Sequence, residues 1–142
     1  MSVKQTTPQD SWEILKEDKN SLLVDVRTYE ELRFVGFTDL SSINAKSVIL
    51  PWRVYPEMNI DQNFANKLSY FIAKTFPNNS AKINLLFVCL SGGRSHEAAV
   101  LMSEFGYECH NIIGGFEGDL DAQGHRGNIN GWKAQNLPWG QK

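Results

Sequence analysis

The sequence predicts an α/β protein whose central parallel sheet has helices on both faces. Residues 21–26 and 85–88 are near-continuous apolar runs, which are typical of strands that are covered on both sides. Amphipathic segments of helical period alternate with such runs, and this alternation favours parallel strands joined by crossover helices. The 142 residues contain no repeat, linker or low-complexity run, so we expect one domain over residues 1–142.

The individual elements follow from local signals along the chain. We expect strands at residues 3–6, 21–26, 47–50, 85–88 and 108–113, and helices at residues 9–18, 29–35, 63–76, 95–106 and 131–136. Thr7 and Thr28 precede two of these helices, and each hydroxyl can accept from a free amide of the first turn. The remaining segments are expected to be loops at 36–46 and 53–61, a turn at 77–80 and a short helical turn at 116–122.

Composition argues against several functional classes. The net charge is −2 and lysines and arginines do not cluster, so a nucleic-acid or membrane-surface partner has no electrostatic support. No apolar stretch reaches the ~20 residues that a membrane span needs. The two cysteines stand twenty positions apart, which suits neither a disulfide scaffold nor a zinc site. We therefore expect a cytoplasmic protein in a reducing setting, with no metal or cofactor and with no nucleic-acid or membrane partner.

The segment 85–106 joins a buried strand to a helix through a loop with two adjacent glycines. Cys89 ends the strand, and Gly92 and Gly93 let the backbone amides of the loop turn inward. Ser95 is expected to cap the helix, because its hydroxyl can accept from an amide two or three residues further on. Unpaired amides and the helix dipole then form an anion cradle, which favours the nucleophilic thiolate of Cys89 over its thiol.

The two cysteines have different settings. A buried, inert packing role is the alternative for any free cysteine. Glycines, an arginine and a serine follow Cys89, so we interpret it as the nucleophile, whereas Cys109 lies inside a strand and is interpreted as packing.

Arg94 either attracts an anionic donor or braces the loop, and the sequence leaves both roles open. The expected substrate-binding residues are Leu90, Ser91, Gly92, Gly93, Arg94 and Ser95.

Asp25 and Arg27 stand at the end of the strand 21–26. Ligands of parallel sheets bind outside the carboxyl ends of the strands, where Asp25, Pro51 and Cys89 all lie. A buried Asp25 needs partners, and Arg27 and the loop amides are candidates. We interpret Asp25 and Arg27 as a supporting, structural ion pair, with a catalytic role as the alternative.

The three histidines are not needed as bases, because the cradle itself can ionise Cys89. We expect His96, His110 and His125 to be structural or exposed.

Three stretches carry a further signal: Asp25-Val26-Arg27 with Glu30 or Glu31 and Gly36, the loop Cys89-Leu90-Ser91-Gly92-Gly93-Arg94-Ser95, and Gly114-Gly115-Phe116 followed by Gly131-Trp132-Lys133 and Leu137-Pro138. In this order they resemble motifs of the rhodanese, or sulfurtransferase, family, and the resemblance covers nearly the whole chain. The loop resembles the family's active-site pattern, commonly Cys-Arg-x-Gly-x-Arg-Ser. Leu90 departs from this loop pattern. The histidine that the family usually has directly after the glycine at position 36 is also absent, because Phe37 stands there. The resemblance implies a rhodanese-like fold and a cysteine that carries a persulfide.

The function implied by this resemblance is sulfur transfer without a cofactor. The Cys89 thiolate would attack the outer sulfur of a small-molecule donor, and a thiol or cyanide, or a protein acceptor, would then remove that sulfur. The amides of residues 90–95 would hold the persulfide anion.

Two alternatives stay open from the sequence. A phosphatase or arsenate reductase on the same scaffold needs a wider Cys-x5-Arg loop, whereas Cys89 and Arg94 have the shorter Cys-x4-Arg spacing. A sulfur-relay or protein-binding module would use the same cysteine, so the sequence does not separate it from a free-standing enzyme.

Overall fold

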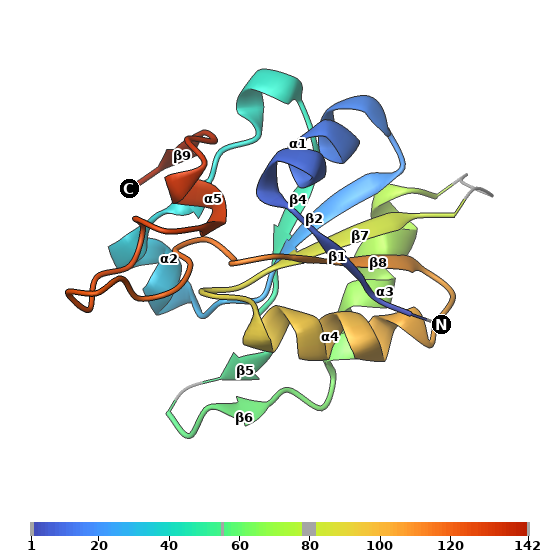
Figure 1. The fold of residues 1–142 in the computed structure, drawn as a ribbon. Helices are drawn as coiled ribbons and strands as arrows, with labels where there is room; N and C mark the ends of the chain where they lie inside the picture. The colour runs from blue at the N-terminus through green and yellow to red at the C-terminus, as the bar shows by residue number, and fades with distance from the viewer. Residues whose placement is uncertain (1, 55, 78–81, 142) are drawn as a thin grey trace.

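A parallel sheet of five strands forms the centre of the molecule, with strand order β1-β8-β7-β2-β4 (Figure 1). The structure is a computed structural model that describes residues 2–54, 56–77 and 82–141. Its elements are β1 (Lys4–Thr6), α1 (Pro8–Glu17), β2 (Ser21–Asp25), α2 (Tyr29–Val35), β3 (Phe37–Thr38), the short helix η1 (Ser41–Ile43), β4 (Ser47–Ile49), β5 (Arg53–Val54), β6 (Asn59–Ile60), α3 (Phe64–Thr75), β7 (Asn84–Val88), α4 (Gly93–Ser103), β8 (Glu108–Ile112), α5 (Gly131–Ala134) and β9 (Trp139–Gly140). The predicted central parallel sheet is therefore confirmed.

Helices cover both faces of this sheet, as the apolar strand runs predict. Adjacent residues of a strand point to opposite faces, so Leu22 and Leu23 of β2 belong to two different core clusters, as do Phe87 and Leu86 of β7. The cluster with Leu22 and Phe87 packs against α3 and α4, and the other cluster packs against α1 and α5 (Figure 1). Both central strands are thus buried on two sides, which explains their continuous apolar sequences.

Both predicted threonine caps are present. Thr7 Oγ1 accepts from the Asp10 amide at 3.1 Å at the start of α1. At the start of α2, Thr28 Oγ1 accepts from the Glu31 amide at 3.2 Å, and Glu31 Oε1 accepts from the Thr28 amide at 3.0 Å. This capping box orients the Glu31 side chain at the N-terminal turn of α2.

Two segments that we expected to be loops contain short strands. Within residues 36–46, β3 pairs antiparallel with β9 and η1 follows it, and within residues 53–61, β5 pairs antiparallel with β6. Strands of two residues are too short to show an alternating pattern, so the sequence alone does not reveal them.

The predicted helical turn at 116–122 is wrong. These residues form turns and irregular backbone, because Gly114, Gly115 and Gly118 all adopt positive φ angles, which a right-handed helix does not allow. The predicted turn at 77–80 lies outside the described residues except for Pro77.

Candidate active site at the Cys89 loop

Cys89 directly follows β7 at the carboxyl edge of the sheet and is 1% exposed. Its Sγ accepts a hydrogen bond from the Gly92 backbone amide at 3.1 Å and lies 3.2 Å from the Ser95 hydroxyl. The helix α4 begins at Gly93, so the positive end of its dipole lies at the loop. The structure therefore brings the cysteine, the loop amides and the helix start together.

Ser95 is not the cap of α4, contrary to the sequence-based expectation. Gly92 is the N-cap residue, with a φ angle of 119° that favours glycine. Ser95 lies inside the first turn, fully buried, and its hydroxyl is 2.5 Å from Asn111 Oδ1 as well as close to the Cys89 sulfur. The same hydroxyl lies 3.2 Å from the Gly92 carbonyl oxygen, so three acceptors compete for its one proton. Asn111 was not singled out from the sequence, because its partner lies sixteen positions away on another element.

Arg94 braces the loop against α2. Its Nη1 and Nη2 donate to Glu31 Oε1 and Oε2 at 2.7 and 2.8 Å, and both side chains are largely buried, at 18% and 17% exposure. Burial opposes the charge of Glu31, but the hydrogen bonds from Arg94 and Thr28 outweigh it and lower the Glu31 pKa. The hydrogen bond to Glu31 likewise raises the pKa of Arg94. Of the two roles left open for Arg94, this geometry favours the brace.

Asp25 and Arg27 form the buried ion pair that the sequence suggested. Arg27 Nε and Nη2 donate to Asp25 Oδ1 and Oδ2 at 3.0 and 2.7 Å, and the Arg27 backbone amide adds a bond to Oδ1 at 3.1 Å. The guanidinium also lies over the Phe116 ring, 4.3 Å from its centroid. The Phe116 amide donates to the Cys89 carbonyl at 2.8 Å. The pair therefore supports the segment that holds the cysteine backbone.

The segment 114–118 closes the back of the Cys89 loop. Besides the Phe116 bond, the next two amides donate to the Leu90 carbonyl at 3.0 and 3.2 Å. Gly115 has a φ angle of 62°, and a Cβ there would lie 2.5 Å from the Cys89 carbonyl oxygen. In the sequence, the adjacent glycines at 114–115 are the signal for this close approach.

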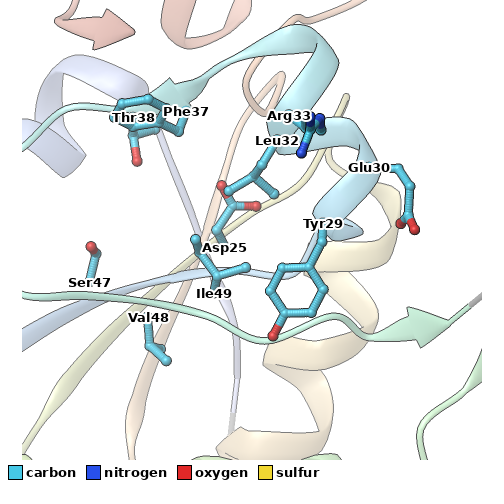
Figure 2. Close-up of a pocket in the computed structure, with 10 residues that line it drawn as sticks. All are labelled: Asp25, Tyr29, Glu30, Leu32, Arg33, Phe37, Thr38, Ser47, Val48 and Ile49. Carbon is cyan, nitrogen blue, oxygen red and sulfur yellow. The ribbon is translucent and has the colours of Figure 1, made fainter. Parts of the chain in front are cut away.

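A cavity of about 520 Å³ lies between α2, β3 and the edge strand β4 (Figure 2). Its lining residues are Asp25, Tyr29, Glu30, Leu32, Arg33, Phe37, Thr38, Ser47, Val48 and Ile49. Neither Cys89 nor residues 90–95 belong to this lining. Asp25 lies among the lining residues in Figure 2, and both of its carboxylate oxygens are bonded to Arg27. The cavity is thus a neighbour of the Cys89 loop and not part of it.

The described residues contain neither a candidate metal site nor a candidate membrane-spanning helix. No three or more His, Cys, Asp or Glu side chains in this part of the chain gather in a way that would hold a metal ion. None of the described helices combines the length and the apolar character that crossing a membrane requires.

The fold and the loop define a class of protein: an α/β protein that holds a cysteine at the carboxyl edge of a parallel sheet, where a backbone amide and a serine hydroxyl at the start of a helix contact its sulfur. The sequence model of the Rhodanese-like domain family matches residues 7–122. The chain therefore belongs to the rhodanese-like family.

The chain is also similar to several known proteins over nearly its whole length. An uncharacterised protein of Rickettsia conorii is 34% identical over 98% of both chains. The crystal structure of Rv0390 from M. tuberculosis matches with a TM-score of 0.82 and 36% identity, and the match covers 100% of both chains. The solution structure of a polysulfide-sulfur transferase homodimer from Wolinella succinogenes matches with a TM-score of 0.59 and 17% identity, over 99% of this chain and 80% of that one. At that identity the last likeness shows the fold alone.

Proposed function

We propose that this protein is a sulfurtransferase that carries a sulfane sulfur as a persulfide on Cys89. The observation that carries the proposal is the position of the Cys89 sulfur, 3.1 Å from the Gly92 amide and 3.2 Å from the Ser95 hydroxyl at the start of α4. Hydrogen-bond donors and a helix N-terminus stabilise a sulfur anion. The Wolinella protein, described as a polysulfide-sulfur transferase, shares this fold and gives the class further support.

The reaction has two displacement steps. The Cys89 thiolate attacks the outer sulfur of a donor, so a new S–S bond forms while the donor's own bond to that sulfur breaks and its electron pair leaves with the donor remnant. A nucleophilic acceptor then attacks the outer sulfur of the persulfide, takes that sulfur and returns Cys89 to its thiolate. The loop amides offset negative charge on sulfur in both steps.

The charges of the loop favour donors with little negative charge. Leu90 carries no charge, and the guanidinium of Arg94 is already paired with Glu31. Residues 89–95 therefore offer no unpaired positive side chain to a dianion. We expect an organic hydropersulfide to be a better donor than thiosulfate.

The same features disfavour the phosphatase alternative. A phosphate or arsenate needs a wide ring of amides and a free cation, whereas Arg94 is held by α2 and Cys89 is 1% exposed. A single sulfur atom on Cys89 needs less space than a phosphate or arsenate group does.

Intact mass spectrometry tests the proposal. We expect incubation with an organic hydropersulfide to add the mass of one sulfur, and a thiol or cyanide to remove it. Loading followed by transfer only to a protein acceptor would favour the relay alternative. No loading by any sulfane donor, or Cys89-dependent hydrolysis of an aryl phosphate, would contradict the proposal.

A further inference from the structure

The strand β4 forms one edge of the parallel sheet, and within the described part of the chain it pairs only with β2. The amides of Leu23 and Leu50 donate to carbonyl groups across this pair, at 3.1 and 2.9 Å. These bonds fix the direction of each β4 backbone group, because successive residues of a strand direct their N–H and C=O groups to opposite edges. The backbone groups of Val48 therefore face β2, whereas those of Ser47 and Ile49 face away from the sheet.

The outward backbone groups of β4 are open. Those of Ser47 and Ile49 have no hydrogen-bond partner among the described residues. Native proteins commonly protect such an edge with a charged residue, a proline or a covering segment. The sequence of β4 is Ser-Val-Ile, which contains neither a charge nor a proline, and Ile49 is exposed. The strand β4 is therefore a template on which another strand can pair.

The cavity beside β4 follows this open edge. All three residues of β4 line it, although Ser47 and Ile49 point toward α2 and β3 while Val48 points the other way (Figure 2). Tyr29 of α2 and Phe37 of β3 form part of its walls. A cavity that borders consecutive residues of a strand runs along the backbone, so its shape suits an extended chain segment.

The pattern of open groups is its own complement. When two β4 strands meet antiparallel with Val48 opposite Val48, Ser47 of one copy stands opposite Ile49 of the other. Each of these residues then exchanges both of its backbone hydrogen bonds with its counterpart. The same pairing places Lys46 opposite Leu50, so no like charges face each other between the two strands. A second copy of β4 thus satisfies every open group of the first.

We propose that β4 is a dimer interface of this protein, occupied by β4 of a second copy that is paired antiparallel about a twofold axis. The two sheets become one continuous sheet. The two cavities meet on the same face of it, because opposite residues of paired strands point to the same side. Each copy thereby completes the cavity of the other.

The interface is separate from the Cys89 loop. Leu23, the register partner of Ser47, belongs to the core cluster on one face of the sheet, whereas Cys89 belongs to the cluster on the other face. Register partners in parallel strands point to the same face, so the cavity and the Cys89 sulfur lie on opposite faces. The inference therefore does not depend on the proposed function.

Sedimentation velocity on the full chain tests the oligomeric state. We expect a monomer–dimer equilibrium at about 1–100 µM protein. Ser47→Pro removes one outward amide from each copy and leaves the bonds to β2, because that amide faces away from the sheet. Half of the bonds between the copies are lost, so the dissociation constant should rise about 5- to 150-fold. Ser47→Ala keeps the amide and should dimerise as the wild type does.

A second variant places a charge on the open edge. Ile49→Lys should be monomeric over the same concentration range, because a lysine on an edge strand opposes pairing. Val100→Lys is the matched control, since Val100 of α4 is 46% exposed and Ile49 is 40% exposed. The Val100 variant should remain dimeric.

Amide hydrogen exchange locates the interface within the chain. In the wild type, exchange at the Ser47 and Ile49 amides should slow as the protein concentration rises, whereas in Ile49→Lys the Ser47 amide stays fast. A wild type that is monomeric throughout, a dimer that survives both Ser47→Pro and Ile49→Lys, or outward amides that exchange equally fast in monomer and dimer would overturn the inference. Protection of these amides only after a different protein is added would also overturn it, because the edge would then belong to another partner.

Discussion

Cys89 and Cys109 belong to the same core cluster and are equally buried, at 1% exposure, yet their sulfurs have different surroundings. The Cys89 sulfur faces donors from Gly92 and Ser95. Cys109 lies inside β8, and its thiol has no hydrogen-bond partner among the described residues. Burial and then the charge of Glu108 raise the pKa of the Cys109 thiol to about 12. Burial and the nearby carboxylate thus keep the Cys109 thiol neutral, whereas the equally buried Cys89 sulfur lies against hydrogen-bond donors.

Exchange of each sulfur for oxygen gives the largest expected contrast. Cys89→Ser should abolish sulfur loading, because a serine oxygen cannot carry the persulfide. Cys109→Ser should load sulfur as the wild type does and lose about 1–3 kcal/mol of stability, since it buries a hydroxyl without a defined partner. Intact mass spectrometry and urea unfolding measure the two effects. A Cys109 variant that no longer loads sulfur would reverse the comparison.

The close approach behind the loop predicts the next largest effect. Gly115→Ala places a methyl group 2.5 Å from the Cys89 carbonyl oxygen at a positive φ, so the loop must move. We expect a loss of about 2–5 kcal/mol in unfolding free energy, together with a loss of sulfur loading. Gly124→Ala is the matched control, because its φ is also positive but no atom lies within 4 Å. It should cost about 1–2 kcal/mol and leave loading intact.

The Arg94 brace predicts an effect that does not depend on donor charge. Arg94→Ala leaves Glu31 largely buried without its cation, and should cost about 1.5–3 kcal/mol of stability. Sulfur loading should fall by the same factor with thiosulfate and with a neutral donor, as measured by loading rates. Arg33→Ala, at an exposed arginine of α2, should change neither. A loss confined to anionic donors would mean that Arg94 binds substrate.

Because the pKa of Glu31 is lowered, the contribution of the Arg94–Glu31 pair to the free energy of unfolding depends on pH. The folded state keeps Glu31 charged at a lower pH than the unfolded chain does, so its contribution is present above about pH 4.3. That contribution disappears as the pH falls through the folded pKa. Urea unfolding should therefore show that the stability difference between wild type and Glu31→Gln shrinks below about pH 4. A stability difference that stays constant below about pH 4 would mean that the contribution of Glu31 does not depend on its charge.

The raised pKa of Cys109 predicts the smallest effect, on alkaline stability. The unfolded chain loses this proton near pH 9.0, while the folded protein keeps it up to about 12. Stability therefore falls as pH rises through this window. Compared with the wild type, Cys109→Ala should lose about 1 kcal/mol less between pH 8 and pH 10. Urea unfolding at the two pH values measures this, and equal losses would contradict the raised pKa.

Local patterns were sufficient to predict most of the architecture from the sequence. The strands of the sheet, the caps at Thr7 and Thr28, and the position of Cys89 before a helix all depend on residues close in the chain. Their physical causes, which are side-chain periodicity and hydrogen bonds within one turn, act over a few residues.

Long-range partners were not predictable in the same way. Arg94 finds Glu31 across 63 positions, and two-residue strands such as β3 exist only through their distant partners. The role of Ser95 was wrong for a related reason: its hydroxyl has a choice of acceptors, and the buried Asn111 decides which one it meets.

The pairing of β1 with β8 also affects how the protein folds. Gln5 meets Asn111 across 106 positions, and the chain must close a loop of that size before this bond can form. Contacts of such long range slow folding, because their entropy is lost before their energy is gained. We therefore expect the contact between Gln5 and Asn111 to form late in folding, so that Asn111, which meets Ser95 beside Cys89, lacks its partner until β1 docks on β8.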